Sequence, residues 1–428
     1  MNTYPLGKSV QHDFPFFELN PGITYLDSTA TSLKPSVVIE AITDYYSRYS
    51  VNIHRGVYAL SVEATEKFEA VRKAVLNFLQ APNEIEAIFT KGTTESINLL
   101  AVSLERVKKE LAPFFSNWQS GLEKDDVILI SESEHHSNLV PWQMLAERTG
   151  AKVVYIPVRA DGSLQTEFIS QNEFSHHKLK IVALSATSNV SGVVHDLNPF
   201  RELARKNGAI FMIDAAQAIC HAETSWVEFS ADFIAFSAHK MLGPTGLGIL
   251  AGHRDVLSVM PPFHGGGDMI ALVKKEGTTY NHPPHRFEAG TPPIAEAIGF
   301  GAALQYLNKI GMKNVEQWEH DLTAYALAQL EENGWHNYGP SSDDVISGRV
   351  RKAGAISFGI EGVHPHDIGT ILDETGVAIR AGHHCCQLLM QSWGVPATAR
   401  ASLYIYNDRD DIDRLIDGLR MVKKIFKK

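Results

Sequence analysis

Cysteine, positive charge and long apolar segments are all scarce in this chain. Its 428 residues include three cysteines, too few for a disulfide framework, which suits a reducing compartment. Lysine and arginine number 39 against 49 aspartates and glutamates, a net charge of −10, so we expect neither a nucleic-acid-binding surface nor a polybasic membrane segment. Residues 1–17 contain Lys8, His12 and Asp13 and no continuous apolar run. We therefore expect no secretory signal, no membrane span and a cytosolic protein.

The remaining composition is that of an ordinary globular protein. Hydrophobic residues make up 44% and charged residues 21% of the chain, and the length allows two domains. Short apolar runs alternate with stretches whose apolar residues recur at helical spacing, such as Ile97, Leu100 and Leu104. The strand-like runs cover residues 87–90, 127–130, 153–156, 181–185, 209–213, 232–236 and 246–250. This alternation predicts an α/β protein.

One lysine occupies an uncommon position. Lys240 follows a strand-like run at 232–236 and precedes a glycine-rich turn. An ammonium at the edge of a core is costly unless it is paired, exposed or chemically consumed, and a covalent bond to an aldehyde removes it. Asp214 ends another strand-like run, and a carboxylate beside a pyridine nitrogen keeps a pyridoxal phosphate (PLP) ring protonated. Each residue alone is more often a turn lysine or a helix cap. Together they predict PLP bound covalently to Lys240.

Two further segments are typical of ligand sites. Gly92, Thr93 and Thr94 open a helix directly after a strand-like run, where free backbone N–H groups and the helix dipole favour a phosphate. A simple threonine cap is the alternative. His135 follows the run at 127–130, and in open α/β sheets ligands bind at the carboxyl ends of strands.

These motifs together resemble a known family. Ser237-Ala238-His239-Lys240, with Asp214 to Gln217 upstream, resembles the class V aminotransferases of the fold-type I PLP enzymes. Arg380-Ala381-Gly382-His383-His384-Cys385 narrows the resemblance to group II (Suf-type) cysteine desulfurases. It runs from about Tyr25 to the C-terminus. It implies an α/β, fold-type I architecture, with a large PLP-binding domain with a mostly parallel sheet at 25–300 and a small α+β domain at 301–428, completed by residues 1–24.

The resemblance also assigns roles to individual residues. It implies that Lys240, Cys385 and His135 are catalytic, and that His135 stacks on PLP and assists proton transfer. In homologous dimers the residue matching Thr291 contacts the PLP phosphate of the neighbouring subunit, which implies a homodimer. The implied cofactor-binding residues are Lys240, Asp214, Gln217, Ser237, His239, Thr94, His135 and Thr291. The implied substrate-binding residues are Arg400, Asn189, Arg55 and Arg380.

The cysteine pair near the C-terminus has a chemically active setting. Cys385 follows Arg380, His383 and His384, and cationic and imidazole neighbours favour the reactive thiolate. The rival interpretation is a metal site built from the His-His-Cys-Cys run. Successive strand residues point to opposite faces and the chain has no CxxC motif, so we predict no metal site. The resemblance places the family's cysteine at Cys385, and adjacent side chains diverge at a strand end, so Cys385 and not Cys386 is the predicted nucleophile.

The implied activity is removal of sulfur from L-cysteine. The products are L-alanine and a persulfide on Cys385, which passes to a sulfur-acceptor protein of the type that serves iron–sulfur cluster assembly. A selenocysteine lyase acting on L-selenocysteine uses the same residues. A transaminase or a kynureninase-like enzyme uses the PLP set without Cys385, and a catalytically silent sulfur carrier needs no cofactor.

Overall fold

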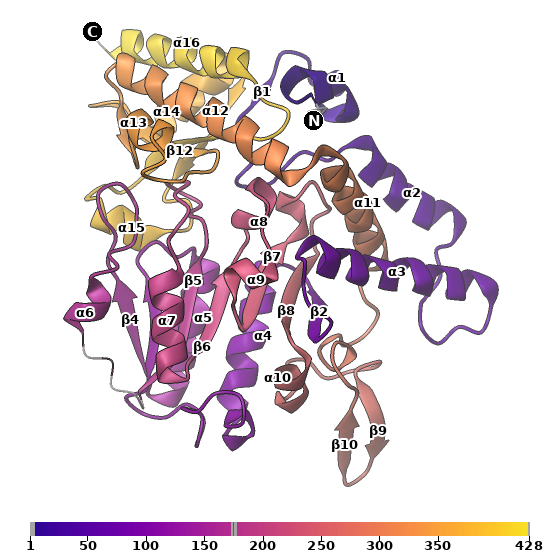
Figure 1. Ribbon diagram of the computed structural model, residues 1–428. Helices are drawn as coiled ribbons and strands as arrows, with labels where there is room; N and C mark the ends of the chain where they lie inside the picture. Colours follow the sequence, from indigo (N-terminus) through magenta and orange to yellow (C-terminus); the bar gives the residue numbers. More distant parts are fainter. Residues whose placement is uncertain (1–4, 173, 175–177, 427–428) are drawn as a thin grey trace.

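The computed structural model describes residues 5–172, 174 and 178–426. Its centre is a seven-stranded sheet in the order β2-β8-β7-β6-β5-β3-β4 (Figure 1). The strands are β2 (Ile85–Thr90), β3 (Val127–Ser131), β4 (Lys152–Ile156), β5 (Leu179–Ser185), β6 (Ile210–Asp214), β7 (Phe233–Ser237) and β8 (Gly248–His253).

The sheet is mostly parallel, which confirms the predicted α/β fold. Strands β4, β3, β5, β6 and β7 are parallel to their neighbours in this group, and β8 is antiparallel to both β2 and β7. The connection from β7 to β8, residues 238–247, is too short for the helical crossover that parallel neighbours require. All seven residues of β5 are buried, as expected for a parallel strand covered on both faces.

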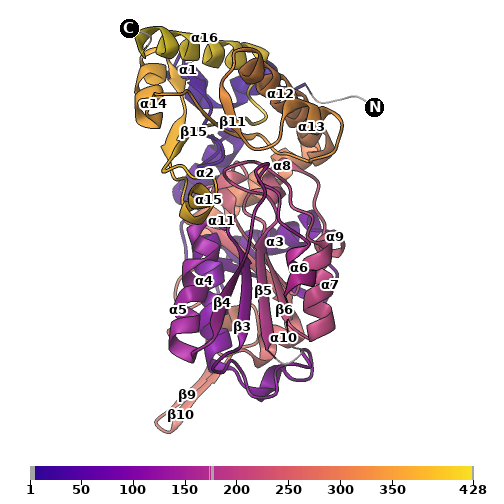
Figure 2. The ribbon, with the colours of Figure 1, turned by 90° about the vertical axis from the view of Figure 1, so that its left-hand side faces the viewer.

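Helices cover both faces of this sheet (Figure 2). On one face α4 (Thr93–Arg106), α5 (Val140–Thr149) and α10 (Arg254–Val259) share a core with Trp142 and Leu100. Phe115 and Trp118 are buried in the same core, so the aromatic stretch before β3 packs against the domain. The other face carries α2 (Ser36–Arg48), α3 (Ala59–Phe78), α7 (Asn198–Asn207) and α11 (Ile294–Ile310), with the short α6 (Phe168–Gln171), α8 (Ala218–His221) and α9 (Trp226–Phe229).

The C-terminal part forms a second sheet with its own core. Four strands lie in the order β11-β12-β15-β14 and are antiparallel. The helices packed with them share a core that includes Leu327, Phe358 and Leu419. The strands are β11 (His336–Tyr338), β12 (Ala355–Gly359), β14 (Arg380–Gly382) and β15 (Thr398–Ser402), and the helices are α12 (Met312–Glu332), α13 (Ser342–Ile346), α14 (Pro365–Glu374) and α16 (Arg409–Phe426). The short helix α15 (Gln387–Ser392) instead contributes Leu389 and Met390 to the core of the large domain.

The described part of the N-terminal segment contacts this C-terminal part. Strand β1 (Thr24–Tyr25) pairs with β13 (Val377–Ala378), and Gly7 N donates to Ile405 O at 2.8 Å. Helix α1 (Pro15–Leu19) lies near α16 in Figure 1. These contacts support the proposed division, in which residues up to 24 complete the small domain; residues 1–4 lie outside the described part of the chain.

The expected boundary at residues 300 and 301 needs a correction. Helix α11 runs without interruption from Ile294 to Ile310, and its contacts are chiefly with α2 and α3. A boundary at 300 would divide one helix and separate its second half from its own core. We propose that the division falls at Gly311, which has a φ of +85° and separates α11 from α12.

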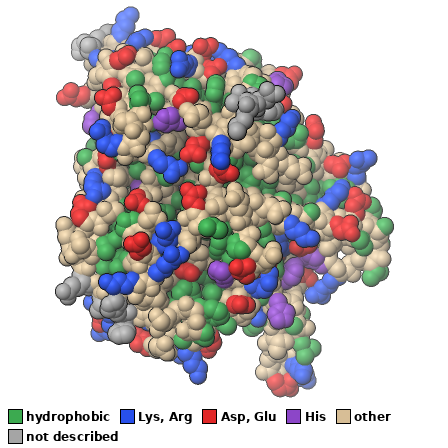
Figure 3. All heavy atoms as spheres, viewed as in Figure 1, with side chains coloured by type: hydrophobic (Ala, Val, Ile, Leu, Met, Phe, Trp, Pro, Cys, Tyr) green, Lys and Arg blue, Asp and Glu red, His purple; other side chains and the backbone are tan. Residues whose placement is uncertain are grey.

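A two-stranded hairpin projects from the large domain. It consists of β9 (Ile270–Lys274) and β10 (Gly277–Tyr280) and lies at the bottom of Figure 1. Leu272 and Val273 are exposed on it. On the face in Figure 3, acidic and basic side chains are interspersed over both domains. Within the described ranges, every helix is too short or too polar to cross a bilayer.

Candidate active site

A cavity of about 290 Å³ lies where the carboxyl ends of β5, β6 and β7 meet the C-terminal domain. Strand β15 and the loop between β14 and α15 supply the wall from that domain. All of the predicted site residues line this cavity except Arg55 and Thr291. Those that line it are Thr94, His135, Asn189, Asp214, Gln217, Ser237, His239, Lys240, Arg380, Cys385 and Arg400.

Lys240 and Asp214 are brought together on this cavity by neighbouring strands. Lys240 ends the short 3-10 helix after β7, and Asp214 is the last residue of β6. Burial lowers the pKa of Lys240, and the charge of Asp214 opposes that shift. Burial raises the pKa of Asp214, whose Oδ1 accepts from Ala216 N at 2.9 Å. Among the described residues, the Lys240 amine has no hydrogen-bond or ion-pair partner.

The N-terminus of α4 forms one end of the cavity. Gly92 has a φ of +156°, and a Cβ on Gly248 of β8 would lie 2.3 Å from Gly92 Cα, so both positions require glycine. Thr93 N donates to Ser237 Oγ at 2.8 Å, and Thr94 Oγ1 lies 2.7 Å from Ser137 Oγ. Backbone N–H groups, hydroxyls and a helix dipole therefore converge here, as an anion site requires.

Burial favours the neutral form of His135 and His239, two of the three histidines that line the cavity. His135 Nδ1 accepts from Ser137 N at 3.1 Å, so the ring proton lies on Nε2. Burial, and then the charge of Lys240, lower the pKa of His135 to about 3. Burial also lowers the pKa of His239 to about 4.

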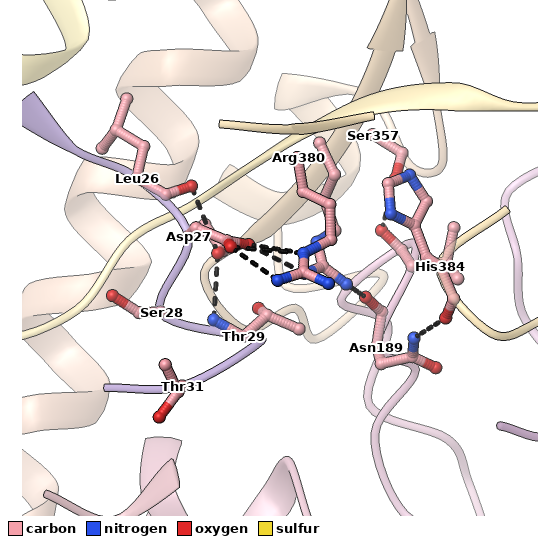
Figure 4. A network of polar contacts seen from close by, with 12 residues as sticks. Leu26, Asp27, Ser28, Thr29, Thr31, Asn189, Ser357, Arg380 and His384 are labelled. Carbon is pink, nitrogen blue, oxygen red and sulfur yellow. Dashed lines mark hydrogen bonds and ion pairs between the residues drawn. The ribbon is translucent and has the colours of Figure 1, made fainter. Parts of the chain in front are cut away.

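Asp27 holds the two arginines of the cavity. It accepts from Arg380 Nη2 at 3.0 Å and from Arg400 Nη2 at 3.2 Å. Arg400 Nη1 donates to Asn189 O at 2.8 Å, and Asn189 Nδ2 donates to His384 O at 2.7 Å. Figure 4 shows Asp27 linked to Arg380 and Asn189 linked to His384. Arg400 is 2% exposed and its Nε has no partner within the described chain.

Cys385 and Cys386 point in different directions. Cys385 is exposed, whereas Cys386 is buried and lies with Sγ 3.9 Å from Glu132 O. Burial raises the pKa of Cys386. His384 and Cys385 have φ values of +52° and +55°, which are uncommon without glycine. His384 Nε2 lies 3.0 Å from Thr398 Oγ1, and the possible ligand atoms of the His-His-Cys-Cys run do not gather at one point within the described chain.

Two predicted residues are not part of the cavity in the single chain. Arg55 is 69% exposed and pairs with Asp268 at 3.0 Å. Thr291 is exposed, and its expected contact involves a second subunit. Both roles therefore stay predictions.

A group of possible metal ligands lies near Arg55. It consists of His54, Glu69 and His285. Arg72 donates to both oxygens of Glu69, at 2.9 and 3.2 Å, and His54 Nε2 lies 3.1 Å from the same carboxylate. The carboxylate is already satisfied, and we assign this group to an ion-pair network.

Sequence reasoning missed Asp27, Ser137 and Glu134. Glu134 is fully buried and accepts from Ser185 N at 2.9 Å and from Asn138 Nδ2 at 2.6 Å. These bonds attach the loop that contains His135 to the carboxyl end of β5. Asp27 follows a strand-like segment and Glu134 directly precedes His135. Their position after a strand was therefore the signal that could have identified them as site residues. No pattern in the sequence, however, pairs Asp27 with arginines about 350 residues away.

Comparisons with known proteins extend over almost the whole chain. The model of the class-V aminotransferase family matches residues 24–415. A probable cysteine desulfurase of Halalkalibacterium halodurans is 44% identical over 405 residues, which cover 94% of each chain. The solved apo cysteine desulfurase of Thermococcus onnurineus NA1 superposes with a TM-score of 0.89 and 36% identity, covering 99% of this chain and 100% of that one. The S-sulfonic acid form of the Escherichia coli cysteine desulfurase CsdA gives a TM-score of 0.83 and 35% identity, over 97% and 98% of the two chains. The chain belongs to the class-V aminotransferase family.

Proposed function

We propose that this protein is a PLP-dependent cysteine desulfurase. One observation carries the proposal: a single cavity holds a partnerless lysine, a buried strand-end carboxylate, a buried arginine and an exposed cysteine, at Lys240, Asp214, Arg400 and Cys385. The relatives named above are a probable cysteine desulfurase and a solved cysteine desulfurase, and both align with this chain over nearly their full length. A transaminase or kynureninase-like enzyme has no use for the cysteine.

The donor set of the cavity fits PLP. Lys240 is the free amine that a covalent bond to the aldehyde needs, and Asp214 is the carboxylate for the pyridine nitrogen. The start of α4 with Thr94, Ser237 and His239 would hold the phosphate, and Gln217 the ring oxygen. When bound, PLP supplies an electron sink that weakens bonds at the substrate α- and β-carbons.

Arg400 would hold the α-carboxylate of L-cysteine. A guanidinium makes two parallel charge-assisted bonds to a carboxylate, which fix its orientation as well as its position. Asp27 and the Asn189 carbonyl occupy other donors of Arg400 and fix the plane of its guanidinium. Arg380 forms an ion pair with the same Asp27 carboxylate and adds positive charge at the cavity wall.

Lys240 and His135 would move the protons of the reaction. Burial lowers the pKa of Lys240, which increases the fraction of free amine that can accept the Cα proton. His135 is neutral, with its ring hydrogen on Nε2. Its Nε2–H can donate a hydrogen bond without adding a further positive charge to the cavity.

Cys385 would take the sulfur. As its thiolate forms an S–S bond with the substrate sulfur, the substrate C–S bond breaks and the carbon receives a proton, so that L-alanine leaves and Cys385 carries a persulfide. Cys385 shares the cavity with the guanidinium groups of Arg380 and Arg400, which suits an anionic nucleophile.

The test is to incubate the protein with PLP and L-cysteine and to measure alanine and protein-bound persulfide together. We expect equal amounts of the two in the first turnover. L-selenocysteine, assayed in parallel, tests the lyase alternative. Alanine without persulfide, or pyruvate in place of alanine, would contradict the assignment.

We further propose a homodimer, to which Thr291 contributes across the interface. The support is its exposure in the single chain together with the family resemblance. Light scattering of the holoenzyme measures the mass, and Thr291→Val should release PLP faster than the wild type. A monomer that retains PLP and full activity would contradict this proposal.

A further inference from the structure

A buried histidine lies next to the cavity, between the two domains. His221 ends α8, one turn after Gln217, and its side chain is 7% exposed. Its Nε2 lies 3.2 Å from Gln217 Oε1, and its Nδ1 lies 2.8 Å from Glu319 Oε2. Glu319 belongs to α12 of the C-terminal part and is 1% exposed. One imidazole therefore connects the cavity wall to a carboxylate from the other domain.

The hydrogen bonds fix the orientation of the Gln217 amide. The atom of Gln217 that faces the Thr29 carbonyl oxygen lies 3.0 Å from it. A carbonyl oxygen only accepts, so this atom is the amide nitrogen, and the amide oxygen faces His221. A flipped amide would bring two oxygens together at Thr29. His221 Nε2 must therefore carry a hydrogen.

The other ring nitrogen of His221, Nδ1, faces Glu319 and lies 3.0 Å from its Oε1. Burial raises the pKa of Glu319, and the charge of His221 opposes that shift. Burial acts to lower the pKa of His221, but the Cys220 sulfur and the Glu319 carboxylate raise it well above its ordinary value. The Tyr404 ring packs edge-to-face on the imidazole at 5.5 Å. The His221 and Glu319 side chains are 7% and 2% exposed, so the pair is buried between the two domains.

We propose that His221 is a positioning residue for the cofactor site. It fixes the orientation of the Gln217 amide so that the N–H group, and not the C=O group, faces the cavity. The amide nitrogen has two hydrogens, and Thr29 takes one of them. The second remains for an electronegative atom in the cavity, which Gln217 lines. This inference rests on the proposed PLP-dependent function, where that atom is the oxygen on the cofactor ring. Because Glu319 comes from α12, this arrangement forms only when the two domains are docked.

The test uses the PLP-loaded enzyme and the pH midpoint of its visible absorption band. His221→Phe keeps a flat ring and removes the donor. A cofactor oxygen that loses an N–H donor becomes more basic, so we expect the midpoint to rise by about 0.5 to 1 pH unit and cofactor release to accelerate. His195→Phe is the matched control, since His195 is also fully buried but does not line the cavity. Its midpoint should equal that of the wild type.

A double-mutant cycle separates positioning from a general structural role. If His221 acts through Gln217, His221→Phe should shift the midpoint of the wild type and add nothing to Gln217→Ala. Additive shifts, or an unchanged midpoint in His221→Phe, would overturn the proposal. Should the Phe variant not fold, nitrogen NMR of histidine-labelled wild-type holoenzyme decides, with the signal identified by its loss in His221→Gln. We expect Nε2 of His221 to be protonated at pH 8, and an unprotonated Nε2 overturns the inference.

The two proposals fail in different ways. A wild-type protein that shows no visible band with PLP, and no adduct after borohydride reduction, contradicts the proposed function. A normal band whose midpoint is the same in His221→Phe contradicts only the role of His221.

Discussion

At the scale of single residues, Lys240 combines burial with the absence of a partner in the described chain. A nearby lysine provides a contrast, because Lys34 is also largely buried but donates to the His239 carbonyl at 3.0 Å. A buried amine without a partner is costly unless it is consumed. The chemistry of this site is therefore expected at Lys240 and not at Lys34.

Replacement of the two lysines tests this contrast. Lys240→Ala should abolish the adduct fixed by borohydride and lower alanine formation by at least about 10²-fold, the usual contribution of a general base. Lys34→Ala should keep the adduct. Mass spectrometry of the reduced, digested protein locates the pyridoxyl group, and a pyridoxyl group on Lys34 in the wild type would contradict the assignment.

The two adjacent cysteines differ in exposure, and their replacements should differ accordingly. Cys385→Ser should retain PLP and lose persulfide formation, because the exposed thiol lines the cavity. Cys386→Ala should keep most of the activity and lower the free energy of unfolding by about 1 kcal/mol, because it removes a small buried group. Paired assays of alanine and urea unfolding check both results. Full activity in Cys385→Ser together with inactivity in Cys386→Ala would reverse the assignment.

Site residues could be predicted from the sequence where a residue's own position in a local motif indicates its role. Lys240, Asp214, His135 and Cys385 each directly follow a strand or lie in a contiguous motif, and all four reach the cavity. Asp27 could not be found in this way, because its role depends on ion pairs with Arg380 and Arg400 that only the folded chain creates. The same holds for His221, whose partner Glu319 lies 98 residues away.

At the scale of elements, the loop between β14 and α15 restricts the reach of Cys385. Only residues 383–386 connect the strand to the helix. Two bonds from the large domain hold this loop: His136 N donates to Cys385 O at 2.7 Å, and Asn189 Nδ2 donates to His384 O at 2.7 Å. A tether this short, fixed at two points, keeps a persulfide at the mouth of the cavity.

Small thiols should therefore clear the persulfide slowly, and an acceptor protein that inserts its own cysteine should raise steady-state alanine formation. The measurement compares a candidate acceptor with its cysteine-free variant at saturating L-cysteine. Insertion of Gly-Ser after Cys386 should speed clearance by dithiothreitol several-fold, because the thiol gains reach. The same insertion at the β9–β10 turn is the control. Equal rates with both acceptors would show that the thiol is not sequestered.

Elements were predictable where periodicity is strong and local. The seven strand-like runs correspond to the seven strands of the large sheet, with ends that differ by a few residues. The antiparallel direction of β8 was not predictable from its apolar run, because direction depends on the length of the preceding connection. The proposed shift of the domain boundary from residue 300 to Gly311 has a similar cause: α11 is apolar on most of its surface, and composition does not show which core buries it.

At the scale of the whole molecule, the cavity exists only because two separately cored parts meet. The large sheet supplies Lys240, Asp214 and the start of α4, while β14, β15 and their loop supply Arg380, Arg400 and Cys385. In this arrangement the residues proposed to bind the cofactor and the thiol of Cys385 lie on opposite walls of the cavity. Stability of the docked arrangement therefore matters to activity as much as any single contact.

Two buried histidines should make that stability depend on pH with opposite signs. His195 is fully buried, its ring nitrogens have no partner in the described chain, and burial lowers its pKa to about 4. As the pH falls below about 6.5, the unfolded chain gains a proton at this site that the folded chain refuses, so this contribution to stability is lost between about pH 6.5 and 4. His221 has a raised pKa. Its contribution is fully present below about pH 6.5 and is lost as the pH rises through the folded-state pKa.

The histidine variants separate these two effects by urea unfolding at fixed excess of PLP. Between pH 7 and pH 4, the free energy of unfolding of the wild type should fall by up to about 3 kcal/mol relative to that of His195→Phe. A pKa shift of about 2.5 units at one site corresponds to that energy. For His221→Phe the difference should shrink as the pH rises into the alkaline range, because the contribution of the His221 charge is lost when the ring deprotonates. Parallel pH profiles for the two variants would show that His221 does not carry a charge between the domains.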